Sequence, residues 1–280
     1  MAIARDGKNI VIIYAVMSVK DEGDIIQCSL TKNLEWADRI FVVDNESTDQ
    51  TREIVERFDS DRVTLVATFH GQFQEGIKSI PFNWVNASNN YPPPDWWAVL
   101  DADEYYYDNP KKFLVDVPSY CSRVCTNCCE FIGLERESKP LDPVSYSHYI
   151  PLRWSESRFY RNIRSLHWSD YKDNGPSGVG AVYKKRIRIL HFPFRSVEQI
   201  EKRLAIRKQN KGSSGIAWSN SMFHDASDLL KNYKSGRLVE NNGRLFFERE
   251  ADNFLSKKSD KFKRLIKVFM FYFGFYRKRN

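Results

Sequence analysis

The sequence has 280 residues, of which 42% are hydrophobic, and its formal net charge is +7. This apolar content is ample for a core, so the composition excludes a globally disordered chain. No apolar run reaches the ~20 residues that a helix needs to cross a bilayer, which argues against a membrane-spanning protein. The length suits a single α/β domain with additions.

Positive charge is concentrated near the end of the chain. Residues 256–280 contain nine Lys or Arg and one Asp, a charge of +8, so the remaining 255 residues sum to 7 − 8 = −1. A nucleic-acid enzyme more often spreads positive charge over a working face. We therefore expect a neutral body, no nucleic-acid partner and one peripheral basic segment.

The first hundred residues alternate between predicted strands and predicted helices. Polar residues without a cleavage pattern follow the first apolar run, which therefore indicates a buried strand and not a signal peptide. The spacing of apolar residues predicts helices over 22–36 and 74–90. This alternation favours an α/β fold with an open, mostly parallel sheet flanked by helices. The strands are expected over residues 10–17, 39–43, 63–68 and 96–100.

After residue 110 the pattern loosens into a smaller mixed region. A glycine-rich turn is expected over 174–180 and a basic helix over 196–210. No internal repeat or low-complexity linker divides the chain. Short strands are predicted over residues 158–161, 163–168 and 186–192.

Acidic residues follow three of the predicted strands. Glu22 comes after the first strand, Asp44 directly after the second, and residues 101–104 after the fourth. Ligands of parallel sheets collect at the carboxyl ends of the strands. The sequence therefore predicts that these acidic groups converge at one rim of the sheet.

The D-x-D pair Asp101 and Asp103 ends an apolar, aromatic strand. Two carboxylates there would repel each other unless a cation or a proton relieved them. Carboxylates hold divalent cations, which can neutralise a diphosphate, so this context indicates a metal site. A second pair, Asp59 and Asp61, follows a helix in a polar turn, where capping and solvation explain it.

Asp44 has two open interpretations. A carboxylate at a strand end is suited to accept hydrogen bonds from a nucleoside, and the alternative is that it caps the next helix. No G-x-G-x-x-G follows the first strand, which counts against a dinucleotide cofactor.

Four ordered segments resemble the glycosyltransferase family 2 pattern on the GT-A fold. They read VKDE at 19–22, IFVVDNESTDQT at 40–51, LDADE at 100–104 and HFPFRS at 191–196. The branch that they resemble has R-N-E, V-V-D-N-x-S-x-D-x-T, L-D-x-D-E and H-Y-x-x-R-S in this order. The resemblance covers residues 9–210, and Lys20-Asp21 departs from it where Arg-Asn is commoner.

The resemblance implies a donor, a cofactor and a reaction. A sugar moves with inversion from a nucleotide-diphospho-sugar to a glycan or lipid-linked glycan acceptor, with Mn²⁺ or Mg²⁺ as cofactor. The implied setting is the synthesis of bacterial lipopolysaccharide, capsule or another cell-surface polysaccharide. The implied parts are a nucleotide-sugar-binding half (1–110), an acceptor-binding half of the same catalytic domain (111–255) and a basic tail (256–280).

The resemblance also implies roles for single residues. Inverting transfer needs a carboxylate base within reach of the acceptor hydroxyl. Glu104, beside the metal motif, is the first candidate, and Asp170 in a later loop is the second. The implied nucleotide-binding residues are Val16, Met17, Ser18, Glu22, Asp44 and Asp101, and the implied metal ligands are Asp103, Asp101 and His191.

Two further groups of residues leave alternatives open. The cysteines between Cys121 and Cys129 have short spacings that zinc accepts, but no second C-x-x-C or H-x3-H occurs. We therefore favour unpaired thiols and a reducing compartment. Trp96, Trp97 and the tyrosines at 105–107 are suited either to stack on a sugar or to pack in the core.

The basic tail predicts an amphipathic helix at a membrane surface. Lys and Arg dominate residues 257–267, aromatic residues dominate 268–276, and Arg277-Lys278-Arg279 follows. Such a helix inserts aromatic side chains among lipid headgroups, while each cation near anionic lipid contributes about 1 kcal/mol. We expect a cytoplasmic protein, peripheral on the inner face of the cell membrane. The alternatives are a solvated charged helix and an RNA-binding tail.

Two other classes of function stay open. A nucleotidyltransferase on a similar sheet would need a glycine-rich phosphate loop with Lys after the first strand, and this sequence lacks one. A non-catalytic membrane-surface module would need only the tail. Binding of a nucleoside diphosphate with Mn²⁺ separates that module from an enzyme.

Overall fold

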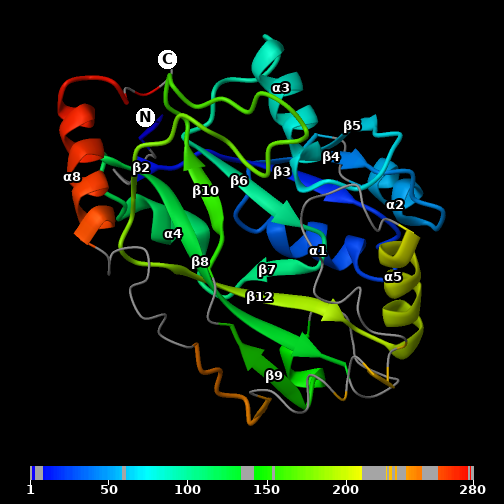
Figure 1. The fold of residues 1–280 in the computed structure, drawn as a ribbon. Helices are drawn as coiled ribbons and strands as arrows, with labels where there is room; N and C mark the ends of the chain where they lie inside the picture. Colours follow the sequence, from blue (N-terminus) through cyan, green and yellow to red (C-terminus); the bar gives the residue numbers. More distant parts are fainter. Residues whose placement is uncertain are drawn as a thin grey trace.

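A large mixed β-sheet forms the centre of the computed structural model, with helices on both of its faces (Figure 1). The structure describes residues 2–3, 9–58, 61–133, 142–152, 155–209, 225, 227–228, 231, 238–247, 258–276 and 278.

The first half of the sheet is parallel. All of its first strand is buried, because a parallel strand with helices on both faces has no solvent side. Its strands are β3 (Ile13–Val19), β4 (Arg39–Asp44), β5 (Val63–Thr68) and β6 (Trp96–Asp101), which lie in the order β6-β3-β4-β5. The connections contain α1 (Ile26–Asn33), α2 (Thr51–Arg57), the 3₁₀ helix η1 (Glu75–Lys78) and α3 (Ser79–Ala87).

The second half of the sheet is mixed. β10 (Ser157–Arg161) runs antiparallel to β6 and continues the sheet to β8 (Cys121–Ile132), β9 (His148–Pro151) and β13 (Val239–Glu240). β12 (Ile187–Phe194) is parallel to β8 and antiparallel to β7 (Glu104–Tyr106). The remaining elements are β1 (Ala2–Ile3), β2 (Asn9–Ile10), α4 (Pro110–Val115), η2 (Pro143–Ser145), β11 (Ala181–Val182), α5 (Val197–Gln209) and α8 (Lys258–Tyr272).

The predicted α/β class is confirmed by this arrangement. The chain forms an open parallel half, a mixed second region and a C-terminal helix, as the sequence indicated. The sheet continues across residue 110, because β10 pairs with β6. In Figure 1, α5 and α8 lie at opposite sides of the sheet.

The core alternates along the central strand, as the period of a strand requires. Ile13, Ala15 and Met17 of β3 pack on the same side as α1 and α2, while Tyr14 and Val16 pack with α3 on the other. The two tryptophans of β6 divide in the same way between these clusters, and each is 1% exposed. Core packing is therefore the role of both tryptophans, and sugar stacking by them is excluded.

One predicted strand was wrong, one strand was not predicted, and one predicted helix has different ends. Residues 163–168 form no strand but only isolated bridges at Ile163 and His167, because the chain turns back there toward residues 177–178. The cysteine run lies in the long strand β8, which we did not predict, because buried thiols behave there as small apolar side chains. The helix predicted over 74–90 begins as a 3₁₀ helix and ends at Ala87.

Candidate functional site

The carboxyl ends of β3, β4 and β6 meet at one edge of the sheet, which we call the rim. The strand register sets Ser18 opposite Asp101 on one side of β3 and Val19 opposite Asp44 on the other. This confirms that the acidic residues after these strands share one edge. Figure 1 shows α1 beside this edge.

The loops after β3 and β4 are bonded to each other at the rim. The backbone N–H of Glu22 donates to the Thr51 hydroxyl at 2.7 Å, and that of Gly23 donates to the Asp49 carboxylate at 3.1 Å. The backbone N–H of Thr48 donates to Asp21 at 2.6 Å. The polar residues at 47–51 therefore hold the preceding loop in place, and with it Glu22.

Two residues at the rim have left-handed backbone conformations, although neither is glycine. The φ angle is 52° at Asp21 and 53° at Glu46. The Lys20 ammonium group donates to the Glu46 carbonyl at 2.8 Å, which connects the two turns. Such conformations cost energy and cluster at binding and catalytic sites.

Asp44 is held in a local turn. The residue is 1% exposed, and its two carboxylate oxygens accept the backbone N–H of Ser47 at 3.3 and 3.2 Å. Its side chain therefore stabilises the turn before α2, a role similar to the helix capping that the sequence left open. Contact with a nucleotide stays a prediction for Asp44.

Val16 and Met17 correct the implied nucleotide-binding set. Both side chains are fully buried, and β3 has a parallel neighbour on each side along these residues. In such a strand the backbone N–H and C=O groups are taken up by the two ladders. Neither residue therefore offers a group to a nucleotide, whereas Ser18 lies at the rim opposite Asp101.

Asp101 is bound by two buried cations. Its oxygens lie 2.6 Å from the Lys78 ammonium and 2.7 Å from the Arg158 guanidinium. Lys78 is 0% exposed and also pairs with Glu75 at 3.0 Å. Burial by itself would raise the pKa of Asp101, but Arg158 and Lys78 outweigh it and lower that pKa. Asp101 is therefore an ionised carboxylate in a compensated cluster.

Asp103 lies in a second cluster beside the first. One oxygen is 3.4 Å from His191 Nε2, and the other is 2.9 Å from Arg203 on α5. Burial would raise the pKa of Asp103, but His191 and Arg203 outweigh it and hold that pKa well below its usual value. His191 Nδ1 lies 3.2 Å from Glu130, so the imidazole ring is held between two carboxylates.

Arg195 connects the first loop to the second cluster. Its guanidinium lies 2.6 Å from Glu22, 2.7 Å from Asp24 and 3.9 Å from Asp103. Burial raises the pKa of Glu22 in spite of Arg195. The structure thus brings Glu22, Asp103 and Arg195 together, although they are distant in sequence.

The two predicted bases have different surroundings. Glu104 has a side chain that is only 5% exposed and bonds to Arg158 at 2.6 Å. Burial raises its pKa to about 8 against the opposing effect of Arg158. Asp170 is exposed in a loop, where it accepts the backbone N–H of Lys172 at 3.4 Å. The role of base stays a prediction for both residues.

The loop that contains Asp170 packs on η1, which also carries Lys78. Gly76 of η1 permits this contact, because a Cβ at that position would lie 2.2 Å from the Tyr171 carbonyl oxygen and 2.3 Å from that of Asp173. The close approach requires glycine. The loop is therefore placed next to the element that supplies a cation to Asp101.

Asp103 and His191 have the donor chemistry that Mn²⁺ or Mg²⁺ accepts. A carboxylate oxygen and an imidazole nitrogen 3.4 Å apart are spaced like neighbouring ligands of one ion, with room for diphosphate oxygens and water. Asp101 directs its oxygens to Lys78 and Arg158 instead. Within the described residues, no three His, Cys, Asp or Glu side chains are grouped as metal ligands. The metal contacts therefore stay predictions.

The remaining predicted groups divide between core and surface. The four cysteines from Cys121 to Cys129 are buried in β8, and none of the five cysteines forms a disulfide. Tyr106 is buried and Tyr105 stacks on Phe192 with ring centres 5.5 Å apart, so of these three tyrosines only Tyr107 is exposed. Asp59 of the second D-x-D pair lies outside the described residues.

Sequence reasoning missed the cations of the site. Lys78 lies in an apolar stretch of a predicted helix, and Arg158 alternates with aromatics in a predicted strand. Arg203 is one of several basic residues of α5. The sequence gives one signal for such a cation: a charged residue in an otherwise apolar stretch, as at Lys78.

Comparisons with known proteins find remote matches only. No family model matches the chain, and no curated protein matches it. Glucosyl-3-phosphoglycerate synthase from Mycobacterium tuberculosis, solved with phosphoglyceric acid, is 14% identical over 43% of this chain and 44% of that chain, with a TM-score of 0.29. TarS 1-349 from S. aureus, solved with UDP, is 13% identical over 92% of this chain and 78% of that chain, with a TM-score of 0.37.

A further match, a crystal structure of a mycobacterial protein, is 17% identical with a TM-score of 0.31. It covers 43% of this chain and 42% of that chain, so this chain spans under half the length of the mycobacterial structures that it matches. With TM-scores of 0.29 to 0.37, the chemistry of the site rests on this chain's own residues.

Proposed function

We propose that this chain is a glycosyltransferase that moves a sugar from a nucleotide-diphospho-sugar to a glycan acceptor. The observation that carries the proposal is the cluster of Glu22, Asp103, His191 and Arg195 at the carboxyl edge of a parallel sheet. Ligands of open α/β sheets bind at this edge. The ordered motifs that resemble family 2 glycosyltransferases supply these residues.

The cations of the site are suited to a diphosphate. Arg203 has a side chain that is 26% exposed, next to Asp103, so its guanidinium is available to an anion at the rim. Arg195 is buried and holds Glu22 and Asp24, which positions the loop that would contact the nucleotide. Guanidinium groups bind phosphate oxygens with directed hydrogen bonds.

We propose that Asp103 and His191 hold a divalent cation, Mn²⁺ or Mg²⁺, together with the donor. When bound, such an ion would neutralise charge that develops on the diphosphate leaving group. Arg203 and Arg195 border the same carboxylate, and their positive charge would add to this stabilisation. Asp101 is bound by Lys78 and Arg158, and this cluster would then stabilise the rim beside the ion.

An inverting transfer requires that the acceptor hydroxyl loses a proton to a base. Glu104 has a raised pKa of about 8 but is enclosed beside Arg158, whereas Asp170 is exposed beside η1. Activity of Glu104→Gln and Asp170→Asn would decide between them, because the variant that removes the base should retain donor binding and lose transfer. We propose an acceptor of the cell-surface polysaccharide class.

The test combines donor binding with turnover. A panel of nucleoside diphosphates and nucleotide sugars with Mn²⁺ or Mg²⁺ should raise the melting temperature of the full chain for its own donor. That donor should be hydrolysed or transferred, and Asp103→Asn should lower the rate by about 100-fold or more. Circular dichroism checks that the variant is folded.

Asp61→Asn is a matched control, because Asp61 belongs to the second D-x-D pair and is exposed in a turn. It should retain the native rate. Unchanged turnover in folded Asp103→Asn would contradict the role of the cluster. Failure of every nucleotide to stabilise the chain would contradict the proposed function as a whole.

A further inference from the structure

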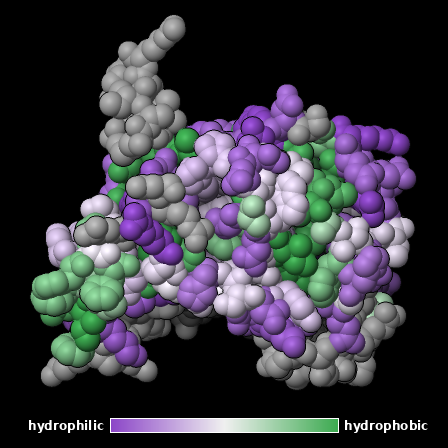
Figure 2. Space-filling model, turned by 90° about the horizontal axis from the view of Figure 1, so that it is seen from above, coloured by the Kyte–Doolittle hydropathy of each residue, from purple (hydrophilic) through white to green (hydrophobic). Residues whose placement is uncertain are grey.

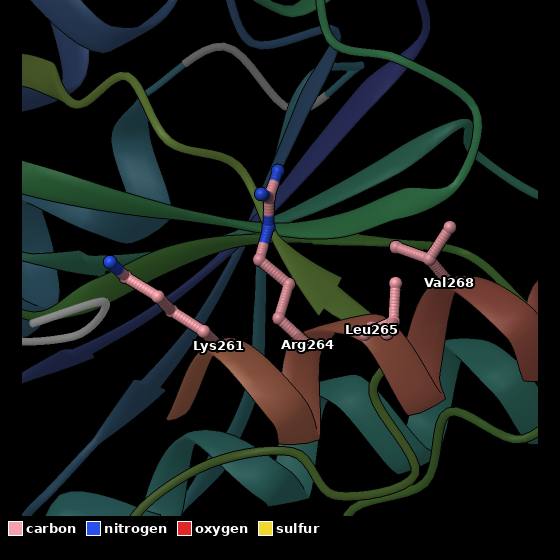
Figure 3. Close-up of a pocket in the computed structure, with 4 residues that line it drawn as sticks. All are labelled: Lys261, Arg264, Leu265 and Val268. Atoms are coloured by element: carbon pink, nitrogen blue, oxygen red, sulfur yellow. The ribbon is translucent and has the colours of Figure 1, made fainter. Parts of the chain in front are cut away.

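The helix α8 packs on the body of the protein with one face only. Lys267 donates to the Val179 carbonyl at 3.0 Å, and Val268 packs against the main core cluster. Figure 3 shows Arg264 extending from α8 toward the strands of the sheet, where its positive charge opposes the rise that burial causes in the pKa of the Cys121 thiol. Arg264, Lys267 and Val268 thus define the docked face of the helix.

The segment after α8 fixes this orientation. Tyr276 packs against the second core cluster, and a Cβ on Gly180 would lie 3.3 Å from the Tyr276 ring. Lys278 forms an ion pair with Asp95 and a β-bridge with Ile163. The helix is therefore held by contacts on one side and beyond its end.

The opposite face of α8 is apolar and exposed. We call it the aromatic stripe: Phe262, Leu265, Ile266, Phe269 and Phe273. These positions follow the i, i+3, i+4, i+7, i+11 spacing of one helical face, and Phe273 continues the helix with a bond to the Phe269 carbonyl at 3.1 Å. Their exposed fractions are 64, 66, 43, 63 and 65%. A helix of a soluble protein normally turns such a face inward.

Figure 2 shows hydrophobic side chains gathered at the left edge of the molecule, where α8 lies in Figure 1. Lys261 and Lys263 stand on either side of Phe262 in sequence and are both exposed. On a helix, these neighbours project to the two borders of the stripe. The stripe is therefore an exposed apolar surface with cations along its margins.

We propose that the aromatic stripe inserts into the headgroup region of a bilayer that contains anionic lipid. Aromatic side chains would enter the interface, and Lys261 and Lys263 would contact lipid phosphates at its surface. No helix among the described residues is both long enough and apolar enough to span a membrane. The binding that the stripe supports is therefore peripheral and parallel to the surface.

Charge favours lipid over a second copy of this chain. Residues 256–280 carry nine Lys or Arg and one Asp, a charge of +8, and a symmetric dimer through the stripe would bring two such segments together. Anionic lipid instead neutralises them. Five cysteines without a disulfide suit a reducing compartment, so we place the contact on the inner, cytoplasmic face of the cell membrane.

The stripe is separate from the rim. The end of the chain pairs with Asp95, directly before β6, whereas Asp101 lies at the other end of that strand. Six residues of strand span about 20 Å. Changes in the stripe should therefore leave nucleotide binding at the rim unaffected, and the membrane proposal stands or falls independently of the proposed function.

The experiment is co-sedimentation of the full chain with vesicles. Vesicles of phosphatidylcholine with about 30% phosphatidylglycerol should bind the native chain, and pure phosphatidylcholine should bind it more weakly. The triple variant Phe262→Ser, Phe269→Ser, Phe273→Ser should lower the ratio of bound to free protein by about tenfold or more. The double variant Lys261→Glu, Lys263→Glu should lower binding to the anionic vesicles more than it lowers binding to pure phosphatidylcholine.

Phe246→Ser is the matched control, because Phe246 is 60% exposed outside the stripe, and it should bind vesicles like the native chain. Equal binding by the triple variant would overturn the proposal, as would a native chain that binds neither vesicle. A native dimer that the triple variant converts to monomers, without vesicle binding, would assign the stripe to a second copy and also overturn it.

Discussion

The rim and the aromatic stripe reverse the usual placement of side chains. At the rim, Lys78, Arg158 and Arg195 are buried and paired with carboxylates, whereas on α8 Phe262 and Phe269 are nearly two-thirds exposed. Burying charges costs desolvation that partners only partly offset, and exposing aromatics forgoes the free energy of their burial. Each region gives up stability, which is why we assign both to binding.

Among the changes at the rim, removing Arg158 should cause the largest loss of stability. Its guanidinium lies within 2.8 Å of three carboxylates, and breaking a buried ion pair by removing one partner costs about 3–5 kcal/mol. Arg158→Met should therefore lower the free energy of unfolding by about this amount in urea denaturation.

Arg188→Met is the control for Arg158. Arg188 pairs with Asp108 through a side chain that is 44% exposed, so loss of this pair should cost about 1 kcal/mol or less. Similar losses for both variants would show that the buried charges of the rim are no different from a surface pair.

Lys78→Met should cost less, because Asp101 retains Arg158. Losing a hydrogen bond to a charged group costs about 1.5–3 kcal/mol, and the same denaturation experiment measures it. The double variant Lys78→Met, Asp101→Asn should lose less than the sum of the two single losses, since each single variant already removes the Lys78–Asp101 pair. A double variant that loses the sum of both single effects would refute the coupling of the pair.

Gly76→Ala tests the loop that packs beside the rim. The new Cβ would meet the carbonyl oxygens of Tyr171 and Asp173 at 2.2 and 2.3 Å, and overpacking of this kind costs about 1–3 kcal/mol. Gly175→Ala is the control, because its Cβ would approach only the Tyr160 hydroxyl, at 3.2 Å. Thermal unfolding should separate the two, and equal melting temperatures would contradict the close packing.

Phe269→Ser on the stripe should have the smallest effect on stability. Exposed surface changes usually stay within about 0.5 kcal/mol, whereas Phe131→Ser at a fully buried position should cost about 3–5 kcal/mol. A large loss in urea denaturation of Phe269→Ser would mean that the stripe supports the fold, and the contrast with the rim would disappear.

Much of the rim could be predicted from local sequence. Asp44 and Asp101 end apolar strands, and parallel strands bring their carboxyl ends to one edge. Val16 and Met17 were implied by the family resemblance instead, and their side chains and backbone are taken up by the core and by the two neighbouring strands. The distance of a residue from the end of its strand decides whether its side chain is exposed. An error of one or two residues in that distance turns an exposed position into a buried one.

The tail was predictable as an amphipathic helix, because Phe262, Ile266 and Phe269 already recur at helical spacing in the sequence. Which face would dock was not predictable, since apolar residues normally turn inward. Contacts of Val268 and Tyr276 with the core clusters decided it.

By itself, the sequence determined the parallel strands, the acidic residues at their ends and the basic aromatic helix, because periodicity and strand ends are properties of neighbouring residues. Only the tertiary structure decided which cations meet those carboxylates. Arg203 and Asp103 are 100 positions apart, and Arg195 and Glu22 are 173 apart. A buried ion pair depends on where distant elements pack, and no local pattern of charges contains that information.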